Sequence, residues 1–251
     1  MDSMPAVSGV SWALVTGAAS RGGAAIARAL HARGLDVVIH HSLRSQAAGD
    51  ALAAELSAVR AGSACTWSAD FAQPGLAVPD WLLSLAPQVL VCNASAFARS
   101  GIADQDRKHA DMRIHLDAHA TILAALLPAS PATSVPILKS VVAVTDIHVA
   151  RPSGGYVWYT VAKAGLQALM AALAVDWAPA VRFNTVQPGT LPFPADWTDA
   201  QRVERITDSI PMRRLGSFDE LAKAVVWLAL DADYVTGQVL AVDGGRSRHL
   251  V

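Results

Sequence analysis

Short apolar runs alternate along this chain with longer, alanine-rich stretches. Runs rich in β-branched residues predict buried strands, and apolar residues at helical spacing predict helices between them. The predicted strands are 12–16, 36–40, 64–69, 88–92, 140–144, 181–186 and 239–242, and the predicted helices are 23–32, 45–60, 104–127, 157–178 and 219–230. Such alternation predicts a doubly wound α/β fold of the Rossmann type, a parallel sheet of about seven strands with helices on both faces.

Local signals refine this pattern at three places. Ser217, followed three residues later by Glu220, predicts a capping box at the start of the last helix. Prolines interrupt the alternation in segments 129–136 and 188–197. The first segment predicts a surface connection. The second follows the carboxyl end of a strand, where open α/β sheets bind their ligands, so we expect a substrate loop over about 188–210.

Composition narrows the class of protein. The chain has 251 residues, 53% of them hydrophobic, and a net charge of −1, which favours a single domain over 1–251 with a cofactor-binding half at about 10–150. This charge gives no reason to expect a nucleic-acid or membrane-surface partner. The first five residues lack a signal-peptide pattern, and the apolar runs fall short of the roughly 18 residues of a membrane span. We therefore expect a cytoplasmic protein, in which Cys65 and Cys92 are reduced core thiols.

A glycine-rich turn follows the first predicted strand and opens a helix. The segment from Thr16 reads T-G-A-A-S-R-G-G and contains Gly17, Ser20, Arg21, Gly22 and Gly23. Such a turn lets the backbone approach a pyrophosphate, which the free N–H groups of the helix N-terminus can bind. Arg21 can reach both a pyrophosphate and a substrate, although a solvent-facing arginine is the alternative.

The residues after the second strand indicate which dinucleotide is bound. An enzyme restricted to NAD ordinarily has an acidic residue there for the ribose hydroxyl. This chain instead has His41, Arg44 and Ser45, whose cationic and hydroxyl groups suit the phosphate of NADPH. Asp70 follows the third strand, where an aspartate can form a turn.

Candidate catalytic residues lie on the helix predicted at 157–178. Tyr159 and Lys163 are four residues apart and therefore share one helical face. A phenol is a poor acid–base group at neutral pH unless a nearby cation stabilises its phenolate, and Lys163 can do this. The pair predicts proton transfer to or from a substrate.

These motifs together resemble those of the short-chain dehydrogenases/reductases. Besides T-G-x-x-x-R-x-G and Y-x-x-x-K, the chain has Pro188-Gly189 after its sixth strand and V-D-G-G at 242–245. The resemblance implies the strand order 3-2-1-4-5-6-7, catalysis by Tyr159 and Lys163 and, commonly, a homotetramer. It also implies contacts to the adenine end of the cofactor from Asp70 and Phe71. The other cofactor contacts that it implies are Asn93, Ala94, Ser95, Tyr159, Lys163, Pro188, Gly189 and Thr190.

At several positions the chain departs from the common family pattern, and the residues there are similar to those of pteridine and dihydromonapterin reductases. Asp146 stands thirteen residues before Tyr159, where most members have serine. A carboxyl group in a closed site can have a raised pKa and relay a proton, or it can merely orient other groups. Arg21 in the glycine-rich turn is a second such departure. The N-A-S-A-F run suggests that Ser95 and Phe97 contact a flat ring, while core packing is the alternative for Phe97.

The long predicted helix at 104–127 carries further polar residues. Asp117 is the residue we align with the family's catalytic asparagine. Asp111, His115 and His119 follow one another at spacings of four residues. We expect an interface or solvent-facing stripe from these three, and no metal site.

The sequence thus predicts an NADPH-dependent reductase acting on the C=N bond of a dihydropterin or dihydrofolate-like small molecule. The expected substrate contacts are Arg21, Ser95, Phe97, Asp146, Tyr159 and Leu191. An NADPH-dependent reductase of ketones, such as a 3-oxoacyl substrate, is the alternative enzyme. A non-catalytic NADP(H)-binding sensor is the alternative of another class.

Overall fold

In the part of the chain that the structure describes, seven strands form one parallel sheet with the order β3-β2-β1-β4-β5-β6-β7. The computed structural model describes residues 11–131, 134–194 and 198–249. The strands are β1 (Trp12–Val15), β2 (Asp36–His41), β3 (Ala64–Ser68), β4 (Val89–Cys92), β5 (Ser140–Val144), β6 (Arg182–Pro188) and β7 (Val239–Val242). The predicted fold class and strand order are confirmed.

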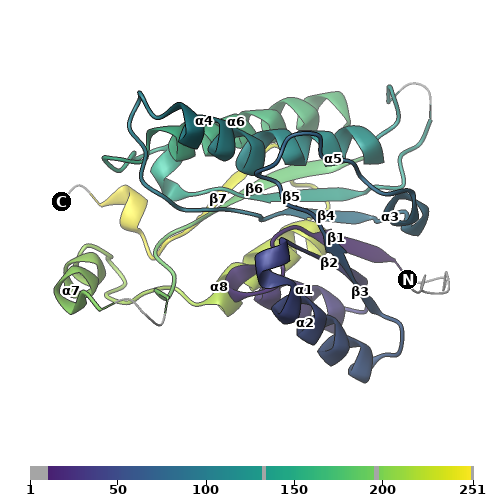
Figure 1. Ribbon diagram of the computed structural model, residues 1–251, viewed down its shortest axis with the longest axis horizontal. Helices are drawn as coiled ribbons and strands as arrows, with labels where there is room; N and C mark the ends of the chain where they lie inside the picture. Colours follow the sequence, from purple (N-terminus) through teal and green to yellow (C-terminus); the bar gives the residue numbers. More distant parts are fainter. Residues whose placement is uncertain (1–10, 132–133, 195–197, 250–251) are drawn as a thin grey trace.

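Helices cover both faces of the sheet (Figure 1). The helices are α1 (Arg21–Ala32), α2 (Gln46–Val59), α3 (Asp80–Leu85), α4 (Gln105–Met112), α5 (Ala118–Leu126), α6 (Val157–Asp176), α7 (Ala200–Asp208) and α8 (Phe218–Val226). Figure 1 shows α4, α5 and α6 on one face and α1, α2 and α8 on the other. The capping box at Ser217 and Glu220 is present at the start of α8 and confirms that prediction.

Two helices are absent from the sequence prediction. The short α3 lies between β3 and β4, and α7 lies inside the segment expected to be a substrate loop up to about residue 210. Prolines disfavour regular structure only as far as residue 194, and Asp199 then caps α7 by accepting a hydrogen bond from the Arg202 amide. Parts of the two proline-rich segments, at 132–133 and 195–197, lie outside the described residues, as do the first ten residues.

The predicted helix at 104–127 also differs in form. It consists of α4 and α5 joined by a π-helical turn, η2 (Arg113–Asp117). A second π-helical turn, η4 (Trp227–Asp231), extends α8. Such turns are frequent at functional sites.

The strands alternate their side chains between two buried clusters. Trp12 and Leu14 pack beneath α5 and α6, whereas Ala13 and Val15 pack beneath α1 and α8. Because β1 is covered on both faces, its residues read as a continuous apolar run. By length and composition α6 could also cross a membrane, and in this fold it packs against α4 and β6.

Parallel pairing brings the carboxyl ends of β1, β4, β5 and β6 to one edge of the sheet. The glycine-rich turn follows β1, Asn93 follows β4, Asp146 follows β5 and Gly189 follows β6. This edge is where open α/β sheets bind ligands.

Candidate active site

The glycine-rich turn has the backbone geometry that a dinucleotide site requires. Gly17 has a φ of +62°, and a Cβ on Gly23 would lie 2.1 Å from the Gly17 carbonyl oxygen. Ser20 begins α1 without using its side chain as a cap, and the first-turn N–H groups of a helix have no intrahelical acceptors. The turn therefore fits a pyrophosphate placed at the N-terminus of α1.

Arg21 occupies a left-handed backbone position, with a φ of +52°. Glycine is the residue that usually tolerates such a φ, so the arginine is a costly choice at this point of the turn. Its Nη2 donates a hydrogen bond of 2.7 Å to the Pro192 carbonyl oxygen, and its guanidinium lies over the Phe218 ring. Arg21 is exposed, as the alternative prediction states. Its hydrogen bond to Pro192 also joins the glycine-rich turn to the segment after β6.

Thr16 and Asn93 hold the ends of β1 and β4 together. The Thr16 hydroxyl accepts hydrogen bonds from the amides of Asn93 and Ala94, at 2.8 and 2.9 Å. Asn93 Nδ2 donates to the carbonyl oxygens of Thr16 and Gly17. A Cβ on Gly17 would lie 2.7 Å from Ala94 Cα, so the glycine-rich turn depends on close packing against the segment just after β4.

The residues after β2 divide into a buried and an exposed set. Arg44 is exposed and Ser45 is half-buried at the start of α2. His41 is buried with its ring packed against Gly49, where an added Cβ would lie 2.4 Å from it. The expectation that His41 presents its ring to a phosphate is therefore wrong. Because Gly49 has no side chain, α2 can pack directly over the His41 ring.

His40 contributes to this corner of the site and is absent from the sequence prediction. Its Nδ1 accepts a hydrogen bond from the Gly17 amide, and its ring stacks on Phe71 at 3.9 Å between centroids. Phe71 is buried by this contact. Asp70 is exposed and accepts a hydrogen bond from the Ala72 amide, which is the geometry of the turn-forming alternative.

Tyr159, Asp146 and His148 form a chain of hydrogen bonds at the carboxyl end of β5. The Tyr159 hydroxyl donates to Asp146 Oδ2 at 2.8 Å. Asp146 Oδ1 lies 2.6 Å from His148 Nδ1 and accepts a hydrogen bond of 2.8 Å from the His148 amide. The structure thus joins the predicted Tyr159 and Asp146 and adds His148, which follows Asp146 by two residues.

The electrostatics of this chain place the proton on the tyrosine. Burial raises the pKa of Tyr159 well above its usual value, and the neighbouring Asp146 charge and hydrogen bond raise it further. For Asp146, burial alone would raise the pKa, but hydrogen bonds and charge from His148, with the bond from Tyr159, hold it below its usual value. The expectation of a raised Asp146 pKa is wrong, because the site supplies several donors to the carboxylate.

Lys163 lies one helical turn beyond Tyr159 and is 1% exposed. Its Nζ donates a hydrogen bond of 2.8 Å to the Val144 carbonyl oxygen at the end of β5. Burial lowers the pKa of Lys163 to about 8, although Asp146 opposes the shift. Tyr159 and Lys163 lie four residues apart on α6 as predicted. The expectation that Lys163 stabilises the Tyr159 phenolate is wrong in this structure, because burial and the neighbouring Asp146 raise the pKa of Tyr159.

Ser95 and Phe97 follow β4 and lie close to Tyr159. Phe97 is 57% exposed, which excludes the core-packing alternative. Its ring stacks on Tyr156 at 4.3 Å between centroids and meets the Tyr159 ring edge-on at 4.9 Å. An aromatic surface of this kind suits a flat ligand.

The segment after β6 is tied to both the cofactor turn and the C-terminal region. A Cβ on Gly189 would lie 2.6 Å from Asp243 Cα, so the backbone of Pro188 and Gly189 passes close to the V-D-G-G segment. Arg246 donates a hydrogen bond to the Thr190 hydroxyl. Leu191 is half-buried and packs against the apolar cluster beneath α8, which leaves less of it to contact a substrate.

His115, not Asp117, approaches Tyr159. Asp117 is exposed. His115 is fully buried, and its ring meets the Tyr159 ring edge-on at 5.1 Å. Its Nε2 accepts a hydrogen bond from the Ala96 amide and lies 3.1 Å from Ser95 Oγ. The alignment of Asp117 with a catalytic residue is therefore wrong. Asp117 follows the buried His115 by two residues and is exposed, so it lies on the opposite side of this π-helical turn, away from Tyr159.

The polar stripe on this helix is internal. Asp111, His115 and His119 are all fully buried, so the expectation of a solvent-facing stripe is wrong. His119 Nε2 lies 3.0 Å from Thr16 Oγ1, which connects this helix to the end of β1. Asp111 accepts a hydrogen bond of 2.5 Å from Arg107. Among the residues that the structure describes, no three such groups lie close enough together to hold a metal ion.

The buried histidines predict acid lability. Burial, their largest influence, lowers the pKa of His40 to about 4 and that of His119 to about 3, and lowers that of His115 well below its usual value. Because the unfolded chain binds protons near pH 6.5 and the folded protein does not, stability present above that pH is lost as pH falls towards 4. Each histidine contributes a slope of up to about 1.4 kcal/mol per pH unit.

Denaturant unfolding at a series of pH values measures this slope. His119→Asn should reduce it, whereas the same measurement on His109→Gln, at an exposed position on α4, should reproduce the wild-type slope. A free energy of unfolding that stays constant between pH 7 and pH 5 would contradict the burial of neutral imidazoles.

The parallel sheet, the glycine-rich turn on β1 and the Tyr159–Lys163 helix at the same sheet edge define an oxidoreductase that uses a nicotinamide dinucleotide. Comparison with known proteins specifies the family. A family model described as enoyl-(acyl carrier protein) reductase matches residues 17–247. The chain belongs to the short-chain dehydrogenase/reductase family.

Relatives of similar identity carry different names. Pteridine reductase 1 of Leishmania tarentolae is 32% identical over an alignment of 278 residues, covering 94% of this chain and 96% of the relative. L-rhamnose 1-dehydrogenase (NAD(P)(+)) of Azotobacter vinelandii is 33% identical over 244 residues, covering 92% and 94%. A putative granaticin ketoacyl reductase of Streptomyces violaceoruber is 41% identical over 111 residues, covering 42% and 43%. Identity alone does not select among these activities.

Proposed function

We propose that this protein is an NADPH-dependent reductase of the C=N bond in a dihydropterin or dihydrofolate-like ring. The observation that carries the proposal is the Asp146 carboxylate, hydrogen-bonded to the Tyr159 hydroxyl at 2.8 Å and held in its charged form. The similarity to a pteridine reductase over nearly the whole chain supports the same assignment.

The charge of Asp146 favours an imine over a ketone. A C=N nitrogen that gains a proton becomes cationic and a better hydride acceptor, and a neighbouring carboxylate stabilises that cation. Reduction of a ketone instead develops negative charge on oxygen, which the same carboxylate disfavours. Most of the family has a serine here, which by resemblance only donates a hydrogen bond to a carbonyl.

The glycine-rich turn and the residues after β2 are the proposed cofactor contacts. Gly17, Ser20, Gly22 and Gly23 form the pyrophosphate cradle, and Arg44 and Ser45 face the ribose phosphate. Asn93, Ala94, Tyr159, Lys163, Gly189 and Thr190 line the nicotinamide end. NADPH, when bound, supplies the hydride.

The chain's own residues then supply the proton and hold the ring. Tyr159 keeps its proton on Oη because its pKa is raised, and it is the proton donor to the ring nitrogen. After Tyr159 has given its proton to the substrate, Lys163 returns a proton to the phenolate. The pKa of Lys163 is lowered to about 8, which favours this transfer. Phe97 and Tyr156 offer stacked aromatic faces to the ring, and Ser95 and Arg21 flank it.

The proposed function is tested by purified enzyme with NADPH and three substrates: dihydromonapterin, dihydrobiopterin and dihydrofolate. Absence of NADPH oxidation with all three would exclude the pterin assignment. Turnover of a ketone panel in their place would support the second candidate, a carbonyl reductase, for which the ketoacyl reductase and rhamnose dehydrogenase relatives provide the support.

Asp146→Ser tests the role of the carboxylate. We expect kcat/KM for dihydropterins to fall by about 100-fold, in the range typical of a group that assists proton transfer. Ketone turnover should rise, because the disfavoured negative charge is removed. Asp176→Ser, at an exposed position at the end of α6, is the matched control. Dihydropterin turnover that survives Asp146→Ser intact would remove the reason for preferring imine chemistry.

Arg44→Gln tests the cofactor preference. Loss of a charge-assisted hydrogen bond of about 1.5–3 kcal/mol should raise KM for NADPH by roughly 10- to 100-fold and leave KM for NADH little changed. Arg28→Gln, which removes an exposed arginine paired with Glu55, is the control. Equal increases in both KM values would show that Arg44 does not discriminate the phosphate.

A further inference from the structure

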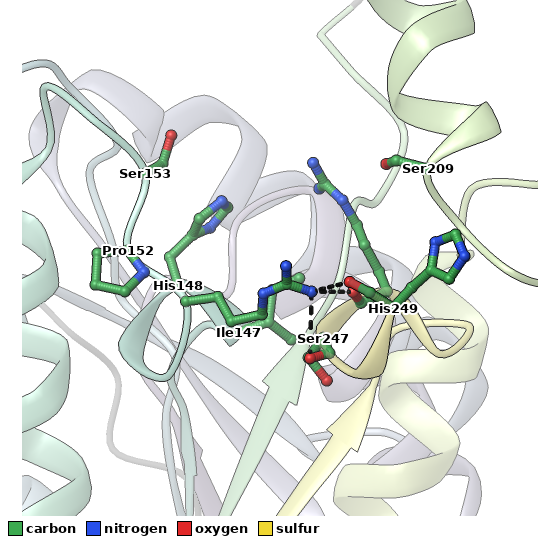
Figure 2. Close-up of a pocket in the computed structure, with 9 residues that line it drawn as sticks. Ile147, His148, Pro152, Ser153, Ser209, Ser247 and His249 are labelled. Carbon is green, nitrogen blue, oxygen red and sulfur yellow. Dashed lines mark hydrogen bonds between the residues drawn. The ribbon is translucent and has the colours of Figure 1, made fainter. Parts of the chain in front are cut away.

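A pocket of about 270 Å³ is lined by His148, the residue that contacts the Asp146 carboxylate. One wall is the segment after β5, including His148, Arg151 and Ser153. The other wall is formed by Ser209 at the end of α7 and by Arg246, Ser247 and His249. Figure 2 shows His148 and Ser153 on one side of the open space and Ser209 and His249 on the other. The pocket is thus assembled from three segments that are distant in the sequence.

The polar groups that line this pocket favour an anion. Arg151 and Arg246 carry permanent positive charges, and His148, His249 and the serines add hydrogen-bonding groups. The adjoining hollow shares Ser209 and Arg246 and is lined in addition by Asp199, Arg202 and Arg205. Arginine side chains present several N–H donors in a fork that matches a carboxylate or a phosphate.

The neighbouring carboxylates are already engaged. Asp146 accepts hydrogen bonds from Tyr159 and His148. Asp243 accepts from the amides of Gly245 and Ser247, at 2.9 and 2.6 Å. Hydrogen bonding does not neutralise these two carboxylates, and both act on the charge of Arg246. The preference for an anion therefore rests on the described lining of the pocket, which contains Arg151 and Arg246 and no acidic side chain.

The C-terminal wall is also held in place by the pocket's own arginine. Arg151 Nη1 donates to the carbonyl oxygens of Arg246 and Ser247, at 3.2 and 3.4 Å, and to that of His249. Arg246 in turn donates to Thr190, in the segment after β6. These hydrogen bonds join the walls of the pocket before an anion binds between the two arginines. Binding therefore loses less conformational entropy from ordering the walls.

The pocket continues directly from the site of proton transfer. His148 lines the pocket, and its Nδ1 lies 2.6 Å from Asp146 Oδ1. In a dihydropterin, the carbon atom of the reduced C=N bond carries the substrate's side chain. A ring nitrogen placed beside Asp146 and Tyr159 therefore puts the start of that side chain next to the pocket wall.

We propose that this pocket binds the anionic end of the substrate's side chain, a carboxylate or a phosphate, between Arg151 and Arg246. The assignment of the side chain to a pterin rests on the proposed function, whereas the preference for an anion rests on the pocket alone. The pocket thus selects among substrates that share one reacting ring.

The first test compares two substrates with the same ring and different side chains, dihydrofolate with its two carboxylates and the uncharged dihydrobiopterin. We expect Arg151→Gln and Arg246→Gln to raise the ratio of the dihydrofolate KM to the dihydrobiopterin KM by about tenfold each, as for the loss of one charge-assisted hydrogen bond. Arg151→Lys and Arg246→Lys keep the positive charge, so their KM ratios should lie between those of the glutamine variants and the wild type. Ser153→Asp, which adds a negative charge and keeps both arginines, should raise it as well. Arg33→Gln, an exposed arginine paired with Asp231, is the control.

The second test needs no turnover. Calorimetry of the NADPH-bound enzyme at constant ionic strength measures binding of p-aminobenzoyl-L-glutamate, a dicarboxylate tail without the pterin ring, and of inorganic phosphate. Saturable binding that Arg151→Gln and Arg246→Gln abolish supports the pocket, and the tighter probe identifies carboxylate or phosphate as the natural group. If no pterin is reduced but this binding is present, the proposed function fails and the anion pocket stands. If neither the KM ratio nor probe binding responds to the arginine substitutions, the anion pocket is excluded even where pterins are reduced.

Discussion

Tyr159→Phe is expected to lower kcat for reduction by roughly 10²- to 10⁴-fold, the contribution of a general acid in the transition state. Tyr159 is buried, and its hydroxyl donates to Asp146 Oδ2 at 2.8 Å. Phenylalanine keeps the edge-on contacts of the ring with Phe97 and His115, so the variant removes the hydroxyl and little else. Steady-state kinetics with NADPH and each dihydropterin measure the change.

The pH profile provides a second readout for the same residue. Burial and the Asp146 charge raise the pKa of Tyr159 well above its usual value, so the free enzyme retains this proton donor at moderately alkaline pH. Tyr234→Phe, at a fully exposed tyrosine, is the matched control. Activity of Tyr159→Phe close to that of the wild type would mean that the proton comes from another group. If the wild type binds NADPH but turns over no substrate, and Tyr159→Phe leaves NADPH binding unchanged, the sensor alternative would be favoured.

Lys163→Met is expected to abolish reduction and, at neutral pH, to stabilise the cofactor-free protein. The ammonium group of Lys163 is enclosed, and its pKa is lowered from 10.5 to about 8. At about 1.4 kcal/mol per pKa unit, keeping this group charged at pH 7 costs the folded state about 3 kcal/mol. The hydrogen bond to Val144 offsets part of the gain on its removal.

The size of this stabilisation decreases as pH rises. Between pH 8 and pH 10.5 the unfolded chain retains the lysine proton and the folded protein does not, so the wild-type free energy of unfolding rises with pH. Methionine lacks this titration. The stability difference between variant and wild type should therefore shrink as pH rises through this window, as thermal unfolding would measure. Lys223→Met, at an exposed position on α8, is the control. A Lys163→Met protein that is less stable than the wild type at pH 7 would contradict a net cost of burying the charge.

The sequence was informative wherever function depends on local spacing. Buried strands of a parallel sheet form continuous apolar runs, so the strand–helix alternation predicts the fold. The glycine-rich turn requires a positive φ at Gly17 and space at Gly23, and both requirements are visible as glycine. Tyr159 and Lys163 lie on one helix, where a spacing of four residues determines that they share a face.

Tertiary structure decided the burial and the charge of polar side chains whose contacts come from distant segments of the chain. His41 is covered because Gly49 of α2 packs against it, and His115 reaches Tyr159 because helix α6 packs beside η2. The charge state of Asp146 depends on donors from His148 and Tyr159, which no spacing rule weighs against burial. The pocket lined by His148, Arg151 and Arg246 joins three segments that meet only in the folded chain. Local periodicity thus determined the fold and the pairing of Tyr159 with Lys163 on one helix. Burial and long-range hydrogen bonding decided which polar residues face the site and in which protonation state.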